Sequence, residues 1–251
     1  MSSSNSGRTA IVTGASKGLG AAMARALAGS GASVVVNYRE DAEGAERVAA
    51  DITAGGGQAL AVQADVASGP DVRWLFARAR EAYGRPVSIL VNNAGVATFG
   101  PLADVTEEQF RRELDTNLLG TVLTTQALAA QDDLDGASVV NISTAGTLTL
   151  PPYGALYIAS KAAVNAFTVT AAKELGPRGI RVNAIAPGPT DTEGARALGF
   201  PGSAQETASI AATPLGRTGL PADYAPLVTF LTSDDARWIT GDVILASGGL
   251  R

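Results

Sequence analysis

Short runs of apolar, mostly β-branched residues recur along the chain and alternate with longer segments whose apolar residues follow a helical spacing. Such runs are typical of buried strands, and their alternation with helices is typical of a parallel sheet. The pattern predicts strands at Thr9–Val12, Ser33–Asn37, Ala59–Gln63, Ile89–Asn92, Ser138–Ile142, Arg181–Ile185 and Val243–Leu245. It predicts helices at Leu19–Ala28, Ala42–Ala54, Pro70–Tyr83, Glu107–Ala130, Tyr153–Leu175 and Asp223–Leu231. We therefore expect an α/β fold: one doubly wound, seven-stranded parallel sheet with helices on both faces.

Length and composition agree with one such domain. Of the 251 residues, 46% are hydrophobic and 17% are charged, which suits a sheet covered on both faces. We expect residues 1–8 to form a flexible N-terminal tail and residues 9–251 to form the domain. No segment resembles a signal peptide or approaches the ~20 apolar residues that span a bilayer. The expectation is a cytoplasmic protein, and the net charge of −5 predicts no nucleic-acid or membrane partner.

The chain contains neither histidine nor cysteine. Their absence excludes a Ser-His-Asp triad, thiolate catalysis and the commonest metal ligands, so we expect no metal site. Proton chemistry then needs another group, and Tyr157 and Lys161 stand four residues apart in a predicted helix. Positions i and i+4 share a helix face, so the Lys161 ammonium can lie beside the phenol and favour its ionised form. The same spacing is also common in ordinary surface contacts.

A glycine-rich segment follows the first predicted strand and opens the first predicted helix. Glycines there allow a tight turn and the close approach of a pyrophosphate to the helix N-terminus. The strand before this segment and the apolar helix after it favour a dinucleotide cradle over an ordinary turn. The candidate cofactor-binding residues in the segment are Gly14, Ser16, Lys17, Gly18, Leu19 and Gly20.

The end of the second predicted strand indicates which dinucleotide binds. A site selective for NAD usually carries Asp or Glu there, to bind the ribose 2′-hydroxyl. This chain has Asn37 and Tyr38 followed by Arg39, and Lys17 lies in the glycine-rich segment. Two cations and no carboxylate at these places favour the 2′-phosphate of NADP(H). Arg39 and Lys17 are also typical of solvated surface charges.

Seven motifs, in this order, resemble the short-chain dehydrogenase/reductase family over nearly the full chain. They are Thr13–Gly20, Asp65-Val66, Asn92-Asn93-Ala94-Gly95, Thr116-Asn117-Leu118, Asn141-Ile142-Ser143, Tyr157-x-x-x-Lys161 and Pro187-Gly188. Within the family, the chain looks most like NADPH-dependent carbonyl reductases related to 3-oxoacyl-carrier-protein reductase. The resemblance implies a Rossmann-type fold, NADP(H) as cofactor, and reversible hydride transfer between NADPH and a ketone or aldehyde.

The resemblance also implies roles for single residues. Tyr157 would be the acid-base, Lys161 would tune it and bind the nicotinamide ribose, and Asn117 would hold a water relay. Asp65 and Val66 would bind the adenine end, although Asp65 is equally suited to cap a helix. The Asn117 side chain would alternatively bond a nearby carbonyl group, and either arrangement would bend its helix. Further cofactor contacts are implied for Asn92, Ala94, Gly95, Tyr157, Pro187, Gly188, Thr190 and Thr192.

The hydroxyl that binds the substrate carbonyl departs from the family pattern. Relatives commonly carry a serine thirteen residues before the tyrosine, and that place holds Thr144. A shift of the loop by one residue would select Ser143 instead. We favour Thr144 and keep Ser143 as the alternative; a threonine would donate the same hydrogen bond but narrow the pocket.

Residues 189–213 carry glycines and prolines among small and apolar residues, which is typical of a mobile lid over a site. Residues that flank the motifs predict an apolar pocket for a small carbonyl or alcohol substrate: Val96, Ala97, Phe99, Leu148, Leu150, Tyr153 and Leu156. The family resemblance and two long helices favour a homotetramer or homodimer, although the same helix faces would also cover the chain's own sheet. Two other functions stay open: an alcohol dehydrogenase that works oxidatively with NAD(P)+, and a sensor that binds NADP without turnover.

Overall fold

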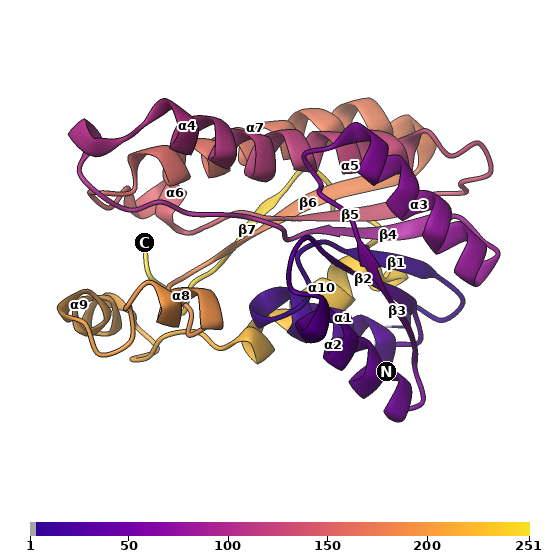
Figure 1. Ribbon diagram of the computed structural model, residues 1–251, viewed down its shortest axis with the longest axis horizontal. Coiled ribbons are helices and arrows are strands. Elements are labelled where there is room, and N and C mark those ends of the chain that lie inside the picture. Colours follow the sequence, from indigo (N-terminus) through magenta and orange to yellow (C-terminus); the bar gives the residue numbers. More distant parts are fainter. Residues whose placement is uncertain (1–3) are drawn as a thin grey trace.

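A seven-stranded parallel sheet forms the centre of the computed structural model, which describes residues 4–251 (Figure 1). The strand order is β3-β2-β1-β4-β5-β6-β7, and all neighbouring strands are parallel. The strands are β1 (Thr9–Val12), β2 (Ser33–Tyr38), β3 (Gln58–Gln63), β4 (Val87–Asn92), β5 (Ala137–Ile142), β6 (Ile180–Pro187) and β7 (Val243–Ala246). From β1 the strand order runs outward on one side to β3, and it then continues on the other side of β1 with β4. The switch point of the sheet thus lies between β1 and β4, and ligands bind at such a point in doubly wound sheets. The predicted fold class is confirmed.

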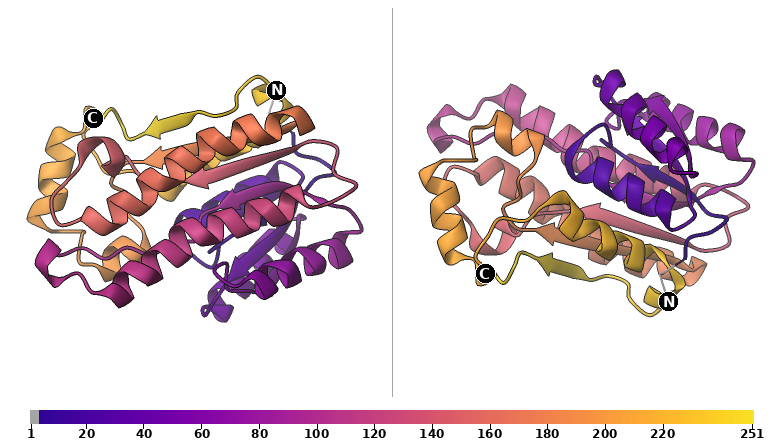
Figure 2. Two further views of the ribbon diagram at one scale, coloured as in Figure 1. Left: turned by 90° about the horizontal axis from the view of Figure 1, so that it is seen from above. Right: turned by 90° about the horizontal axis from the view of Figure 1, so that it is seen from below.

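Helices cover both faces of the sheet (Figures 1 and 2). One face carries α1 (Gly18–Gly29), α2 (Ala42–Ala54) and α10 (Pro221–Thr232). The other carries α3 (Gly69–Tyr83), α4 (Glu107–Leu114), α5 (Gly120–Ala129) and α7 (Ala155–Leu175). Three short helices lie beyond the carboxyl ends of the strands: α6 (Gly146–Thr149), α8 (Glu193–Ala197) and α9 (Ala204–Ala212).

The alternation of side chains along each strand divides the core into two clusters. Val34 of β2 packs with Met23 and Leu27 of α1. Its neighbour Val35 points to the opposite face, where Leu75 of α3 is buried. All five side chains are completely buried, and each such burial contributes about 1.5–3 kcal/mol. Both faces must therefore be covered, which explains why the strands are almost uniformly apolar.

The helix predicted at 107–130 is interrupted. A π-helical segment, Asp115–Leu119, separates α4 from α5, and Asn117 lies in its middle. The Asn117 side chain bonds the backbone of Val96 in the loop after β4, and asparagine is a poor residue for a helix interior. π-helical segments often occur at functional sites. The next predicted helix starts at Ala155 instead of Tyr153, because Tyr153 has a φ of 66° that no α-helix accommodates.

The N-terminal segment is packed from Asn5 onward. Asn5 is completely buried, and its Nδ2 donates to Ser30 Oγ at 3.0 Å and to Thr232 Oγ1 at 3.2 Å. Residues 1–3 of the expected tail lie outside the described residues. Within residues 4–251, no helix has the length and apolar character needed to cross a membrane.

Candidate active site

Side-chain hydrogen bonds join the carboxyl ends of β1 and β4 at the switch point. Asn93 Nδ2 donates to the carbonyl oxygens of Thr13 and Gly14, both at 2.9 Å. Thr13 Oγ1 accepts from the backbone amides of Asn93 and Ala94 at 3.0 Å. Thr13 and Asn93 were not among the predicted site residues, although both stand directly after strands in the recognised motifs. They hold the glycine-rich loop against β4.

The glycine-rich loop lies closely against this junction. Gly14 has a φ of +59°, and a Cβ atom there would lie 2.9 Å from the Ala94 Cα. A Cβ on Gly20 would lie 2.5 Å from Asn93 Nδ2, so neither position accepts a side chain without a shift. Lys17 is the N-cap of α1, and its side chain makes no capping hydrogen bond. The first amides of α1 thus remain available to an anion such as a pyrophosphate.

At the end of β2, Asn37 is buried and bonds the glycine-rich loop, whereas Arg39 is charged and exposed. Asn37 is buried, accepts from Gly14 N at 3.3 Å and donates to Ala64 O at 3.0 Å. Asn37 thus holds the loop through its side chain, and its predicted contact with the cofactor stays a prediction. Arg39 pairs with Glu40 at 2.5 Å, and the side chains are exposed. Lys17 lies 3.8 Å from Asp41, to which Ser16 also bonds. Exposed pairs of this kind contribute little energy, so both cations can reorient toward a phosphate.

The other predicted cofactor residues differ in what the structure places around them. Asp65 Oδ1 accepts from Ala67 N at 2.9 Å in the turn before α3, and the N-cap of α3 is Ser68, so Asp65 is not the cap. Val66 packs against Gly120, where a Cβ would lie 2.6 Å from Val66 Cγ2. Asn92 is buried and donates to Asn141 Oδ1 at 2.9 Å, so it links β4 to β5. Asn92 therefore supports the strand end and does not extend toward the cradle.

Tyr157 and Thr144 meet at the carboxyl end of β5. The Thr144 hydroxyl lies near enough to the phenol of Tyr157 to lower its pKa, and it accepts from Gly146 N at 3.1 Å. Ser143 is buried, and its hydroxyl donates at 3.5 Å to the backbone carbonyl of Lys161 instead. Of the two candidate hydroxyls, the structure brings only Thr144 to the phenol.

Lys161 lies one turn after Tyr157 on α7, but its ammonium is not bonded to the phenol. Lys161 is 4% exposed, and its Nζ donates to the Ile142 carbonyl at 2.8 Å. Burial lowers the pKa of Lys161 to about 8, and the charge of Glu113 partly opposes this shift. Burial also raises the pKa of Tyr157 to about 12, while the Thr144 hydrogen bond opposes this shift and Glu113 adds to it. Desolvation is thus the largest influence on the phenol, and the role of Lys161 in favouring the tyrosinate stays a prediction.

Asn117 joins the helices of the site to the loop after β4. Its Oδ1 accepts from Val96 N at 2.8 Å, and its Nδ2 donates to Val96 O and Ser160 Oγ at 2.9 Å. Ser160 in turn donates to the Tyr157 carbonyl at 2.8 Å. The sequence did not single out Ser160, which precedes Lys161 directly. Gly95 separates the two candidate residues: a Cβ there would lie 3.3 Å from Asn117 Oδ1 and 3.4 Å from Lys161 Nζ.

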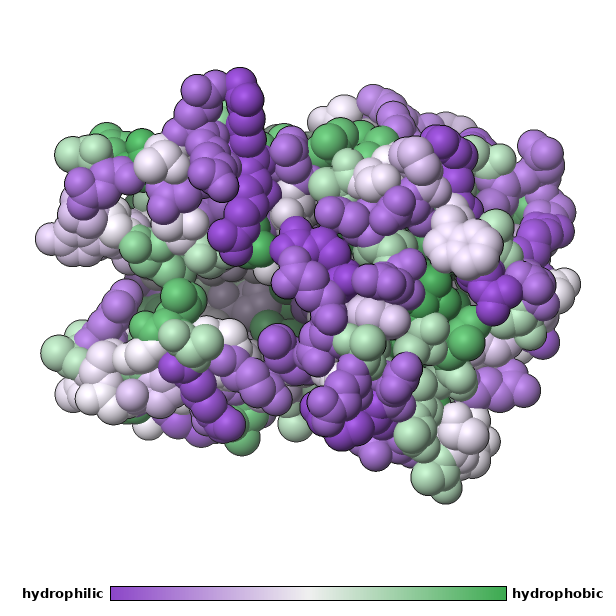
Figure 3. All heavy atoms as spheres, viewed as in Figure 1, coloured by the Kyte–Doolittle hydropathy of each residue, from purple (hydrophilic) through white to green (hydrophobic). Residues whose placement is uncertain are grey.

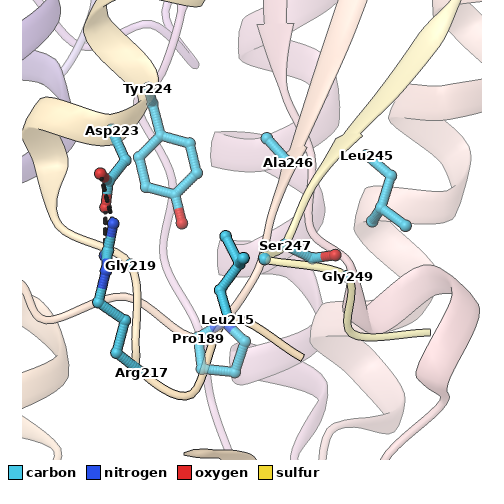
Figure 4. A pocket seen from close by; sticks show the side chains of 11 residues that line it. Pro189, Leu215, Arg217, Gly219, Asp223, Tyr224, Leu245, Ala246, Ser247 and Gly249 are labelled. Atoms are coloured by element: carbon cyan, nitrogen blue, oxygen red, sulfur yellow. Dashed lines mark hydrogen bonds and ion pairs between the residues drawn. The ribbon is translucent and has the colours of Figure 1, made fainter. Parts of the chain in front are cut away.

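The turn after β6 closes the other side of the site. Gly188 donates to the Ala246 carbonyl at 3.0 Å, and Pro187 O accepts from Ala145 N at 2.7 Å. Thr190 Oγ1 lies 2.7 Å from the Tyr224 hydroxyl. Beside this turn is a cavity of about 260 Å³, with the Arg217–Asp223 ion pair on its wall (Figure 4). It is lined by Pro189, Leu215, Arg217, Gly219, Asp223, Tyr224, Leu245, Ala246, Ser247, Gly248 and Gly249.

Residues 189–213 continue from this turn into α8 and α9. Thr192 is the N-cap of α8 and accepts from Ala195 N at 3.1 Å. A Cβ on Gly18 would lie 3.7 Å from the Thr192 Cβ, so α8 begins against the glycine-rich loop. Figure 3 shows a hollow between the part of the molecule that carries α4 and α6 and the part that carries α8 and α9. The glycine-rich loop and the lid segment thus face one another at one end of the sheet.

Apolar side chains predicted for the pocket lie near Tyr157. The Phe99 and Tyr157 rings are 5.6 Å apart between centroids, and Phe99 is 47% exposed. A second cavity, of about 180 Å³, has Phe99, Tyr153 and Leu156 in its wall. Leu148 and Leu150 also expose most of their surface. Among residues 4–251, no cluster of acidic side chains is arranged to hold a metal ion.

Comparisons with known proteins agree with this geometry. A profile for the family described as Enoyl-(Acyl carrier protein) reductase matches residues 14–251. The chain is 51% identical to an uncharacterized oxidoreductase of Methylorubrum extorquens, over 98% of both chains. It is 41% identical to 3beta-hydroxysteroid dehydrogenase 1 of Eggerthella lenta, over 97% of this chain and 94% of the relative. It is 38% identical to an NADPH-dependent aldehyde reductase-like protein of Arabidopsis thaliana, over the same shares of the two chains.

A solved structure gives the same picture at the level of the fold. A short chain dehydrogenase from Burkholderia cenocepacia, in complex with NADP, superposes with a TM-score of 0.90. The two sequences are 37% identical, and the match covers 98% of each chain. Nearly the whole chain therefore has a counterpart in that protein.

Proposed function

Because the chain belongs to the short-chain dehydrogenase/reductase family, we propose that it reduces a ketone or aldehyde to the alcohol, reversibly, with hydride from NADPH. The observation that carries this proposal is the contact between the Thr144 hydroxyl and the Tyr157 phenol, with Lys161 one helical turn away. Two hydroxyls that converge beside a dinucleotide cradle suit a carbonyl oxygen, which accepts two hydrogen bonds.

NADP(H) is the cofactor, and the residues at the switch point fit it. Gly14, Gly18 and Gly20 leave room for its pyrophosphate, and Lys17 and Arg39 supply cations for its 2′-phosphate. When bound, the cofactor supplies the hydride. The NADP complex of the Burkholderia protein and the name of the Arabidopsis relative support this choice over NAD.

The chain's own residues would supply the proton. Thr144 and Tyr157 bind the carbonyl oxygen, and Tyr157 donates its proton as negative charge develops there. With a pKa raised to about 12, the phenol is protonated at neutral pH and ready to act as the acid. The buried ammonium of Lys161 stabilises the tyrosinate that each turnover leaves, until the phenol is reprotonated.

The surroundings of Tyr157 favour an uncharged substrate. Phe99, Tyr153 and Leu156 line a cavity beside Tyr157, and 189–213 would act as a lid that excludes water. We infer that the pocket takes aliphatic or aromatic carbonyl compounds.

A second candidate function is oxidation of an alcohol by the same residues. The 41% identical relative named as a hydroxysteroid dehydrogenase favours it. The residues are the same in both directions, since the tyrosinate form of Tyr157 would then act as the base.

Purified protein mixed with NADPH and a panel of ketones, 1,2-diketones, β-keto esters and aldehydes tests the proposal. We expect NADPH consumption that matches alcohol formation for at least one class. Reduction of NADP+ by alcohols, with no carbonyl reduced, would favour the second candidate. Tight NADPH binding without turnover in either direction would contradict both and favour a sensor.

The two hydroxyls after β5 should respond differently to removal. Thr144→Val keeps the shape of the side chain but removes the hydrogen bond to the carbonyl oxygen, so kcat/KM should fall by about 10–100-fold. Ser143→Ala should change kcat/KM by less than about threefold, because Ser143 faces α7. Steady-state kinetics of both variants with one carbonyl substrate distinguish them. The reverse ranking would assign the role to Ser143.

Arg39→Ala should weaken NADPH binding by about 10–100-fold and leave NADH binding nearly unchanged, because only NADPH has the 2′-phosphate. Fluorescence titration with each cofactor measures both constants. Arg47→Ala on α2 is the control, since Arg47 is also exposed and paired, with Glu43 at 2.9 Å. An equal loss of affinity for both cofactors in Arg39→Ala would contradict the assignment.

We also infer that copies of the chain associate through α4, α5 and the π-helical segment. Phe110 and Leu119 expose 48% and 40% of their surface there, and contact with a second copy would remove this apolar surface from water. Figure 2 shows these helices beside α7 on an open face of the molecule. A tetramer or dimer mass in light scattering would agree with this inference.

A further inference from the structure

Helix α4 buries one side chain, and that side chain is a carboxylate. Glu113 is 1% exposed, whereas the other residues of α4 are partly or fully exposed. Neither Glu113 carboxyl oxygen has a hydrogen-bond partner of ordinary geometry within the described chain. Burial of a charged group without full compensation is costly, so a carboxyl held in this way calls for an explanation.

The groups around Glu113 belong to the active site. Across the interface between α4 and α7, it interacts electrostatically with Lys161 and Tyr157. Thr98, in the loop after β4, offers its hydroxyl and backbone amide, and Arg112 on α4 adds a positive charge from the solvent side. Asn117, which accepts from Val96 N, follows Glu113 by four residues, so Glu113 and Asn117 lie on neighbouring helical turns. The charge of Glu113 therefore reaches both Tyr157 and Lys161.

Burial is the largest influence on Glu113 and raises its pKa. Thr98, Arg112 and Lys161 oppose this shift. The proposed proton transfer does not use Glu113, yet the charge of Glu113 acts on both Tyr157 and Lys161. It raises the pKa of Lys161 against the effect of burial, and it also raises the pKa of Tyr157.

We propose that Glu113 is a positioning residue whose buried carboxylate keeps Lys161 cationic and Tyr157 protonated. The inference rests on the proposed reductase function. In reduction, Tyr157 gives a proton to the carbonyl oxygen, and a proton from solvent must replace it before the next turnover. The charge of Glu113, which acts on Lys161 without forming an ion pair, favours the ammonium into the alkaline range, where burial alone would release its proton. Glu113, Lys161 and Tyr157 then titrate as a coupled group.

Glu113→Gln removes the charge and keeps the size of the side chain. The pKa values of Lys161 and Tyr157 should both fall, so the alkaline limb of the reduction rate should move to lower pH by on the order of 1 pH unit. For alcohol oxidation, which needs the tyrosinate, the acidic limb should move in the same direction. Glu113→Asp, which restores a carboxylate, should move both limbs back toward those of the wild type. A merely structural defect would lower the rates without this common shift.

Stability provides a readout that needs no cofactor. A carboxyl whose pKa is raised in the folded state binds more protons there than in the unfolded state, so folding loses stability as pH rises. For Glu113 this loss begins near its ordinary value of 4.5 and ends above its raised pKa. The melting temperature of Glu113→Gln relative to the wild type should therefore increase with pH across that window. Glu108→Gln, an exposed glutamate of the same helix, should show no such trend.

These readouts keep the inference separate from the proposed function. Wild-type turnover with NADPH tests the function, and pH profiles and melting curves of the Glu113 variants test the inference. Should Glu113→Gln fail to fold, carbon-13 NMR of glutamate-labelled wild type should still show one carboxyl that titrates above the others. That signal should move when Lys161 is replaced by Met. Unshifted pH limbs in a folded Glu113→Gln, or carboxyls that all titrate in the ordinary range, would overturn it.

Discussion

Tyr157→Phe should lower kcat for carbonyl reduction by about 10²–10⁴-fold, the usual contribution of a general acid. The substitution removes only the phenol oxygen, so the ring should keep its contact with Phe99 and the fold should be unchanged. The Kd for NADPH should stay within about threefold of the wild type, because the Tyr157 phenol oxygen is not part of the glycine-rich loop. Single-turnover kinetics and a cofactor titration measure the two quantities.

The matched control is Tyr83→Phe. Tyr83, at the end of α3, is also a partly buried tyrosine. Its hydroxyl donates to the carbonyl of Val34 in β2 at 3.1 Å, away from the switch point. Its loss should cost stability by about 1 kcal/mol and leave kcat unchanged. A Tyr157→Phe variant that retains most of its kcat would remove the proton donor from the mechanism.

Lys161→Met should have the second largest effect, with a loss in kcat of about 10²-fold or more. Methionine fills the space of the lysine stem, but it leaves the Ile142 carbonyl without its donor and the tyrosinate without a nearby cation. NADPH binding should also weaken, because a Cβ on Gly95, in the loop after β4, would lie 3.4 Å from the Lys161 ammonium, which places that charge beside the cradle. Kinetics and the cofactor Kd of the same preparation give both effects.

Lys173→Met serves as the control for this variant, since Lys173 is an exposed lysine of the same helix. It should leave kcat, Kd and the melting temperature nearly unchanged. If Lys161→Met kept the wild-type pH profile and rate, the role of Lys161 would be structural only: its hydrogen bond to the Ile142 carbonyl would hold α7 against β5.

The order of elements was predictable because the central strands are buried on both faces, as in β1 and β5. Such strands are apolar along most of their length, and this pattern is visible even in a run as short as Thr9–Val12. The glycines of the loop were predictable from their place between a strand and a helix. The structure shows why glycine is needed there: a Cβ on Gly14 or Gly20 would collide with the chain. Element boundaries were less well predicted, since Tyr153 and the π-helical segment depend on loop and helix contacts elsewhere in the chain.

The parts of the site that escaped prediction depend on partners far away in sequence. The choice between Ser143 and Thr144 follows from how the strand end turns toward α7, which spacing alone does not decide. Glu113 lies in the segment Glu107–Leu114, where glutamate and arginine predominate, so it looks like one more solvated charge. Asn92 and Asn5 are buried because each finds several distant polar partners. No local pattern indicates such partners.

The most direct test of the proposed reaction is the fate of the transferred hydrogen. NADPH deuterated at C4 of the nicotinamide, in each of its two epimers, would be mixed with the wild-type protein and the most active carbonyl compound, and the alcohol would be analysed by mass spectrometry and NMR. We expect deuterium on the carbinol carbon from one epimer only, with Tyr157→Phe forming this product at least about 10²-fold more slowly. An alcohol free of deuterium from both epimers, or no alcohol at all despite bound NADPH, would contradict the account.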